Sequence, residues 1–258
     1  MADGTWNAVE LTGTAGAAPL VLVCEHASRA IPPELADLGL DAAAREAHVA
    51  WDIGAAVIAR RLSEHLEAPL VAGGVSRLVY DCNRPFTASD CIPARSERYD
   101  IPGNRDLDEA ARRARFERVH EPFHAALAEA CRRQERACGR AIDLVTIHTF
   151  TPVYNGVSRA VEIGYLHHED PALAQAALAV ETAHGVYRAA LDEPYSARDG
   201  VTYTLARHGE AHGRRALMIE VRNDLVATHE AATRMGDHLA QTLREALAAV
   251  PPPAEAAP

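Results

Sequence analysis

Apolar residues fall along the chain in two patterns, short continuous runs and longer stretches with a spacing of three or four. The continuous runs are typical of strands that a sheet buries on both faces, and they occur at 19–24, 141–147 and 216–221. We also predict strands at 160–166 and in the β-rich segment 70–80, which Gly73-Gly74 breaks. The spaced stretches predict helices with one apolar face over 51–66, over 116–130, from Pro171 onward and over 235–250. The chain therefore alternates predicted strands with predicted helices.

This alternation predicts the fold class. Buried strands that alternate with helices indicate an α/β protein, and we expect a three-layer α/β/α sandwich around a mostly parallel or mixed central sheet. Pro122 lies inside a predicted helix, where proline removes a backbone hydrogen bond, so we expect it to kink or split that helix. Residues 1–18 and the Pro/Ala tail 251–258 have no periodic apolar pattern. We expect flexible ends around a single domain over 19–250.

Composition and charge narrow the classes of function. Of the 258 residues, 48% are hydrophobic and 24% are charged, as in an ordinary globular enzyme. The formal net charge of -10 and the lack of a long basic run argue against nucleic acid and anionic membranes as partners. A substrate that carries a carboxylate would need arginines inside its cleft. The amphipathic helices suit a core and a subunit interface equally, which leaves a homo-oligomer open.

The cellular compartment follows from two further features. The first eighteen residues have neither the basic start nor the apolar segment of a secretion signal, and no apolar run approaches the roughly 20 residues of a bilayer span. The five cysteines are odd in number and have no CxxC spacing, so no disulfide framework is expected. We therefore expect a cytoplasmic protein.

Polar clusters follow four predicted strands, at 24–28, 76–84, 148–152 and 220–224. Open α/β sheets bind ligands at the carboxyl ends of their strands. His26 and His148 each follow a buried run directly, and two converging imidazoles are a natural start for a zinc-type site, although a strand-end histidine needs no metal. Asp52, at the start of a predicted helix, is our choice of third ligand; Glu25 and His48 are the alternatives, and helix capping would also explain Asp52.

Glu220 lies near the end of an apolar strand, where a carboxylate is unfavourable unless it is paired, metal-bound or catalytic. We predict that it is the general base. An ion pair with Arg222 is the alternative and is compatible with that role, because residues two apart share a face of a strand. A guanidinium binds carboxylates or stabilises an oxyanion, so we expect Arg77 in a catalytic role and Arg84 and Arg222 at the substrate.

Six motifs occur in order between about residue 20 and residue 226: CEHAS followed by Ile31-Pro32, HVAWDIGA, SRLVYDCNRP, HTFTP, DGVTYTL and IEVRNDL. In these motifs the sequence resembles the N-formylglutamate amidohydrolase family. The resemblance implies hydrolysis of a small acidic N-acyl amino acid, N-formyl-L-glutamate, to formate and L-glutamate, a step of histidine degradation. It supports amide hydrolysis more firmly than it supports this substrate.

The sequence is also distantly similar to zinc carboxypeptidases, in the order of a metal-binding histidine, an Asn-Arg pair, a second histidine and a catalytic glutamate. The residues that follow this order are His26, Asn83-Arg84, His148 and Glu220. The similarity implies a zinc-exopeptidase-like fold, a substrate carboxylate held by the Asn-Arg pair, and a divalent metal. Zinc is the first candidate, although such ligands also accept manganese, cobalt and iron. One departure is Arg29, which stands where these enzymes have a glutamate ligand, so Asp52 or Glu25 must replace it.

Three other functions fit parts of the sequence. Cys24 or Cys82 could be the nucleophile of a metal-free amidohydrolase, with one of the two histidines as its base. The cleft could bind a small carboxylate without catalysis. A metallohydrolase could instead act on another N-acyl amino acid or on a short peptide, and this is the strongest alternative.

Overall fold

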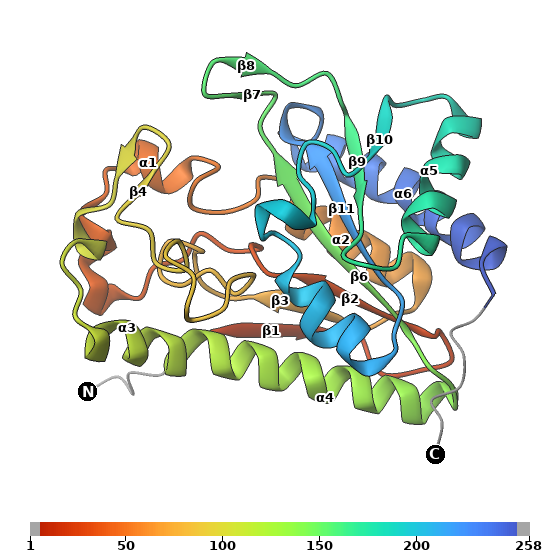
Figure 1. Ribbon diagram of the computed structural model, residues 1–258, viewed down its shortest axis with the longest axis horizontal. Coiled ribbons are helices and arrows are strands. Elements are labelled where there is room, and N and C mark those ends of the chain that lie inside the picture. Colours follow the sequence, from red (N-terminus) through yellow and green to blue (C-terminus); the bar gives the residue numbers. More distant parts are fainter. Residues whose placement is uncertain (1–5, 252–258) are drawn as a thin grey trace.

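The computed structural model describes residues 6–251, which form a mixed seven-stranded central sheet (Figure 1). The strand order across the sheet is β1 (Val9–Thr12), β3 (Leu70–Gly73), β2 (Leu20–Cys24), β6 (Asp143–Phe150), β11 (Ala216–Arg222), β9 (Ile163–Leu166) and β10 (Ala189–Leu191). The strands from β3 to β11 are parallel. β1 is antiparallel to β3, and β9 is antiparallel to β11 but parallel to β10. The prediction of a mixed sheet is confirmed.

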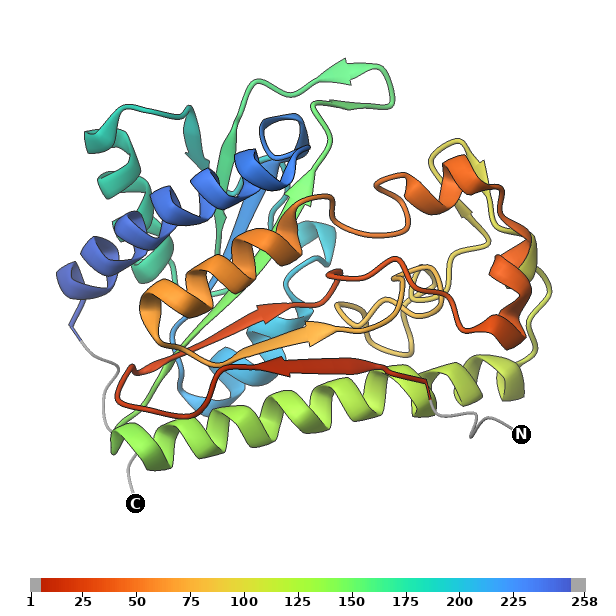
Figure 2. The same ribbon diagram turned by 180° about the vertical axis from the view of Figure 1, so that it is seen from behind.

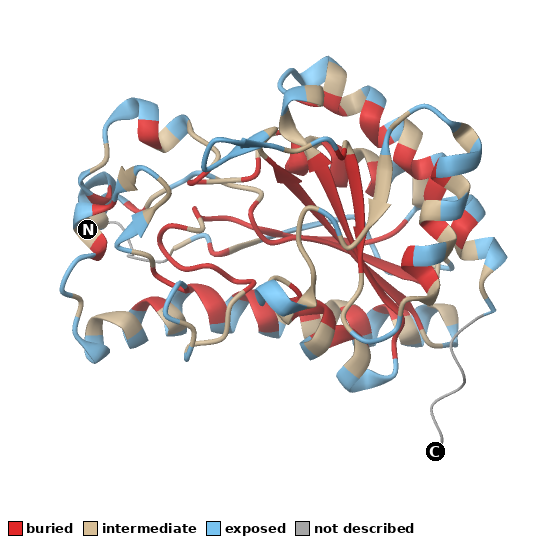
Figure 3. Cartoon of the chain, turned by 45° about the horizontal axis from the view of Figure 1, so that its top comes forward, coloured by how far each residue is buried: buried red, intermediate tan, exposed pale blue. Residues whose placement is uncertain are grey.

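Helices cover both faces of this sheet (Figures 1 and 2). One face carries α2 (Ala55–Leu66), α5 (Ala172–His184) and α6 (His229–Ala249), and the other carries α3 (Glu109–Arg115) and α4 (Glu121–Cys138). A short helix, α1 (Ala42–Glu46), lies outside these layers. Successive residues of a strand point to opposite faces, so Leu20 and Leu22 pack in one core and Val21 and Val23 in the other. Figure 3 shows the buried strands between helices whose outer sides are exposed, which confirms the three-layer sandwich.

The expectation that residues 1–18 lack regular structure is wrong for β1. Val9 pairs with Gly73 and Thr12 with Leu70, so this segment is an edge strand of the sheet. It escaped prediction because it is short and mostly exposed, so it has no continuous apolar run. Residues 1–5 of the predicted N-terminal tail and 252–258 of the predicted C-terminal tail lie outside the described residues.

Two internal predictions also differ from the structure. The β-rich segment over 70–80 is a strand only up to Gly73, at the break predicted at Gly73-Gly74, and residues 75–80 form no strand. Ser76 turns the chain away from the sheet through hydrogen bonds to the backbone carbonyls of Ala30 and Ala50. Pro122 does not break its helix. A π-helical segment at Phe116–His120 joins α3 directly to α4, and proline is tolerated in the first turn of α4, just after this wider turn.

The parallel strands bring their carboxyl ends to one edge of the sheet, so the polar clusters that follow these strands lie near one another. Glu220 on β11 lies opposite His148 on β6, and β2 ends two residues before His26. Two hairpins extend near this edge, β4 (Arg95–Ser96) with β5 (Tyr99–Asp100), and β7 (Val153–Tyr154) with β8 (Val157–Ser158). Among the residues 6–251, no helix combines the length and apolar character that crossing a bilayer requires.

Candidate metal and catalytic site

A cleft of about 340 Å³ opens at the carboxyl ends of β2, β6 and β11. It contains seven of the eight site residues predicted from the sequence: His26, Asp52, Arg77, Asn83, Arg84, His148 and Glu220. The sheet topology explains this convergence, because the ends of neighbouring parallel strands meet at one edge. The structure therefore brings these seven residues together in one cleft.

Arg222 does not line the cleft, which differs from the prediction that it binds substrate. Its guanidinium pairs with Asp224 at 2.8 Å and with Glu162 at 3.5 Å, and it also donates to the backbone carbonyl of Arg159. It forms no ion pair with Glu220. Asp224 follows β11, and Glu162 and Arg159 lie between β8 and β9, so Arg222 is held against that connection.

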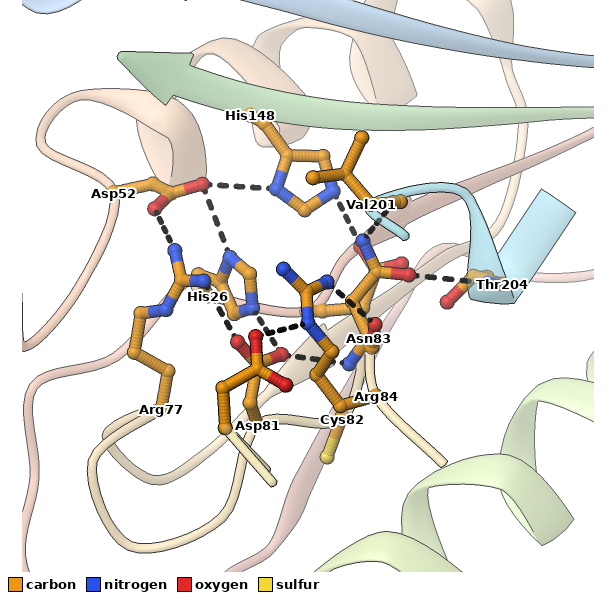
Figure 4. Close-up of polar contacts among 12 residues, drawn as sticks. His26, Asp52, Arg77, Asp81, Cys82, Asn83, Arg84, His148, Val201 and Thr204 are labelled. Atoms are coloured by element: carbon orange, nitrogen blue, oxygen red, sulfur yellow. Dashed lines mark hydrogen bonds and ion pairs between the residues drawn. The ribbon is translucent and has the colours of Figure 1, made fainter. Parts of the chain in front are cut away.

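His26, Asp52 and His148 bring one ligand atom each to a common point, all within 4.8 Å of one another (Figure 4). Oδ2 of Asp52 lies 3.2 Å from Nδ1 of His26 and 2.9 Å from Nδ1 of His148. All three side chains are buried. Two imidazoles and a carboxylate form a donor set that suits zinc and other divalent metals, and they leave a coordination position open.

Each histidine of this triad contacts a second carboxylate through its other ring nitrogen. Nε2 of His26 lies 2.8 Å from Oδ1 of Asp81, and Nε2 of His148 lies 3.1 Å from Oε2 of Glu25. A carboxylate at Nε2 fixes the ring and leaves Nδ1 available to a metal. The buried carboxylates therefore support Nδ1 of both histidines as the ligand atoms, an arrangement that fits a metal.

Arg77 joins two of these carboxylates. It donates to Oδ1 of Asp52 at 3.3 Å and to Oδ2 of Asp81 at 2.7 Å. Burial alone would raise the pKa of Asp52, but the neighbouring histidines hold that pKa well below its usual range. Asp52 is consequently ionised and held in place from both sides, as a metal ligand must be.

The alternatives for the third ligand have other contacts. Glu25 faces Nε2 of His148, on the side of the ring away from Asp52. His48 lines the cleft but pairs with Glu97 at 2.7 Å. Arg29, at the position of the carboxypeptidase glutamate ligand, pairs with Glu46 at the surface. Asp52 is therefore the residue that completes the cluster.

Glu220 is a buried carboxylate on the cleft wall, and its Oε2 has no hydrogen-bond partner. Burial raises the pKa of Glu220 to about 7. A carboxylate with such a pKa exchanges protons readily near neutral pH, which is the property of a general acid-base residue. The pairing of β11 with β6 puts Glu220 opposite His148, next to the triad.

Asn83 and Arg84 bind residues 200–204, which lie within the DGVTYTL motif (Figure 4). The side-chain amide of Asn83 donates to the carbonyl of Val201, and its oxygen accepts from the backbone N–H of Thr204 at 3.0 Å. Arg84 donates to the carbonyl of Gly200 and pairs with Asp90. Both residues reach the cleft, but much of their hydrogen-bonding capacity holds two loops together.

The cysteine alternative finds no support in the site. Cys24 and Cys82 are buried and do not line the cleft. Burial raises the pKa of both thiols well above the usual range, so they remain protonated and are poor nucleophiles.

Sequence reasoning missed several residues around the cleft. Asp81 lies within the SRLVYDCNRP motif, but its contact with His26 joins positions 55 residues apart and no local pattern indicates it. Tyr154 and Tyr195 also line the cleft, and they come from a hairpin and a loop without apolar periodicity.

Asp81 offers a direct test of the outer carboxylates. We expect Asp81→Ala to weaken metal binding by about 10- to 100-fold, because His26 would lose the partner that orients its ring. Competition with a chromophoric chelator measures this affinity, with Asp100→Ala, a change at an exposed ion pair, as the control. An affinity equal to that of the unchanged protein would show that Asp81 does not support the metal site.

Comparison with known proteins places this site in a family. No curated protein matches the chain. The structure is similar to that of a gene product of Agrobacterium tumefaciens, with a TM-score of 0.90 and 45% identity, covering 93% of this chain and 95% of that one. It shares its fold with N-formylglutamate amidohydrolase from Ralstonia eutropha, with a TM-score of 0.64 and 18% identity, covering 93% of this chain and 97% of that one.

The profile of the N-formylglutamate amidohydrolase family matches residues 18–227. That range includes every residue of the triad, the outer carboxylates and Glu220. Since the match covers most of the chain, this protein belongs to the N-formylglutamate amidohydrolase family and is an amidohydrolase.

Proposed function

We propose that this enzyme hydrolyses N-formyl-L-glutamate to formate and L-glutamate with the help of a divalent metal, zinc in the first instance. The observation that carries the proposal is the convergence of His26, Asp52 and His148 beside the unpaired carboxylate of Glu220, in a family member. Such a site suits the hydrolysis of a small amide, and the family suggests which amide.

In the proposed mechanism, the metal would polarise the attacking water and the amide carbonyl. Glu220 accepts a proton from the attacking water and returns it to the departing amino nitrogen. Asp81 and Glu25 keep the imidazoles of the triad oriented. Arg77 fixes Asp52 and, from the cleft wall, is the arginine that would stabilise negative charge on the carbonyl oxygen.

Arg84 is the proposed partner of a substrate carboxylate, with Asn83 holding the loop beside it. The Nε of Arg84 bonds Asp90, and its Nη1 bonds the carbonyls of Asn83 and Gly200. No bond to its Nη2 is present within residues 6–251, so this nitrogen is available at the cleft. Arg222 has no part in this proposal, because it lies outside the cleft.

The proposed reaction belongs to histidine degradation in the cytoplasm. The five cysteines form no disulfide in the structure, which is consistent with a reducing compartment.

The cleft volume favours one further candidate. About 340 Å³ falls within the range of pockets that hold drug-sized ligands, whereas N-formyl-L-glutamate is smaller than these. A larger N-acyl amino acid or a short peptide is therefore the second candidate substrate.

A substrate panel tests the proposal. Metal-supplemented enzyme is assayed with N-formyl-L-glutamate, N-acetyl-L-glutamate, N-formyl-L-methionine and a dipeptide ending in glutamate, at equal concentrations. We expect the highest kcat/KM with N-formyl-L-glutamate. A higher value with the acetyl compound or the dipeptide would establish the second candidate, and binding of all four without turnover would indicate a non-catalytic carboxylate binder.

A further inference from the structure

Arg159 lies beside the cleft, directly after the β7–β8 hairpin, among three aromatic rings. Its guanidinium carbon is 4.6 Å from the ring centroid of Tyr154, 4.7 Å from that of Tyr195 and 5.7 Å from that of Phe150. Distances below about 6 Å are favourable for a cation and an aromatic ring. Arg159 itself is not a lining residue; it lies next to the cleft through its contacts with Tyr154, Tyr195 and Phe150, which do line it.

The arginines that line the cleft are paired with carboxylates. Arg77 pairs with Asp52 and Asp81, Arg84 with Asp90, and Arg95 with Asp100. Arg159 differs, because within residues 6–251 it has no carboxylate partner. Its side chain donates to the carbonyl of Thr151 at 3.4 Å and contacts Tyr195. A positive charge next to the cleft is thus left without a carboxylate partner among the described residues.

The aromatic contacts also set the direction in which Arg159 can bind. Rings that cover the faces of a guanidinium leave its N–H donors, which lie in the plane, for a planar anion such as a carboxylate. The bond from Arg222 to the carbonyl of Arg159 holds the backbone at this position. These contacts hold the guanidinium in one orientation, as in a preorganised carboxylate-binding site.

Tyr195 connects this position to the catalytic carboxylate. Burial and the nearby Glu220 raise the pKa of Tyr195, and Arg159 next to its hydroxyl partly offsets that increase. The hydroxyl therefore lies within electrostatic reach of both residues. A ligand group at Arg159 would therefore lie near Tyr195, which lines the same cleft as Glu220.

We propose that Arg159, Tyr154 and Tyr195 form an anion subsite for the side-chain carboxylate of an acidic N-acyl amino acid. This inference rests on the proposed function and deepens it. An N-acyl glutamate has two carboxylates, and Arg84 accounts for one. The uncompensated Arg159 accounts for the second and makes the enzyme selective for a dicarboxylic substrate over its neutral analogue.

The test compares N-formyl-L-glutamate with N-formyl-L-glutamine, which differ only in the charge and hydrogen bonding of the side-chain end group. For Arg159→Gln we expect kcat/KM with the glutamate compound to fall by about 10- to 100-fold, mostly through KM, as for loss of a charged hydrogen bond. The glutamine compound should change less than about 3-fold. Arg188→Gln removes an exposed arginine and controls for the change in net charge. Arg159→Lys keeps the positive charge but lacks the planar guanidinium, so its kcat/KM with the glutamate compound should lie between those of the unchanged enzyme and Arg159→Gln.

Other results would overturn the subsite. An equal loss with both compounds in Arg159→Gln and Arg159→Lys would mean that Arg159 only supports the hairpin. An unchanged preference for glutamate would mean that its carboxylate binds elsewhere. If the unchanged enzyme hydrolyses neither compound, the proposed function fails, but calorimetry with L-glutamate and L-glutamine still tests the subsite. Selective loss of L-glutamate binding in Arg159→Gln would support it. L-glutamate binding equal to that of the unchanged enzyme would contradict it.

Discussion

His148→Ala is expected to remove the bound metal and, with it, essentially all amidohydrolase activity. The Nδ1 of His148 lies 2.9 Å from Asp52, so the change deletes one of three converging ligand atoms and removes the contacts of His148 with Asp52 and Glu25. Loss of an outer carboxylate typically weakens metal binding by about 10- to 100-fold, and loss of a ligand should weaken it further. Metal content after dialysis and the rate of formate release measure the two effects.

Metal content must be compared between variants that are folded to the same extent. Asp52→Asn nearly preserves shape while it removes the negative charge, so it should lose metal even if His148→Ala is unstable. His65→Ala changes a histidine that pairs with Asp237 far from the cleft, and it should retain full metal content. Stoichiometric metal and normal turnover in both folded site variants would mean that the metal, if any, binds elsewhere.

Glu220→Gln is expected to lower kcat by about 10³-fold, within the 10²- to 10⁴-fold range of general acid-base catalysis, with metal content unchanged. Glutamine has the same size but cannot accept the proton of the attacking water. KM should change little, because the proposed role of Glu220 is confined to the transition state.

A matched control for this change is Glu245→Gln, which removes an exposed carboxylate that contacts His184. Steady-state kinetics with both variants, together with metal analysis of the same samples, separates catalysis from metal binding. Near-normal kcat in a folded, metal-loaded Glu220→Gln enzyme would exclude Glu220 as the general base.

The fold was predictable wherever burial leaves a pattern in the sequence. The runs that became β2, β6 and β11 are apolar on both faces, because helices cover the sheet from both sides. β1 was not predictable in this way. It is an edge strand whose residues are mostly exposed, and its pairing with β3 depends on a segment 60 residues away.

The inner part of the site was predictable for the same reason. His26, His148 and Glu220 are polar residues at the ends of buried strands, and parallel strands bring their ends together. The contacts of the arginines were not predictable, because the sequence does not show which carboxylate each guanidinium pairs with in the fold. Arg222 follows Glu220 by two residues, yet Glu162 and Asp224 hold it outside the cleft. Arg159 lies in no apolar pattern, and only its packing against aromatic rings distinguishes it.

The central claim is that this family member cleaves N-formyl-L-glutamate with a metal held by His26, Asp52 and His148. The most direct measurement is formate release from N-formyl-L-glutamate by one purified sample, before chelation, after chelation and after zinc is restored, with metal content determined each time. We predict turnover that disappears with the metal and returns with about one zinc ion per chain. Full turnover in the metal-free sample, or no zinc binding at saturation, would contradict the account.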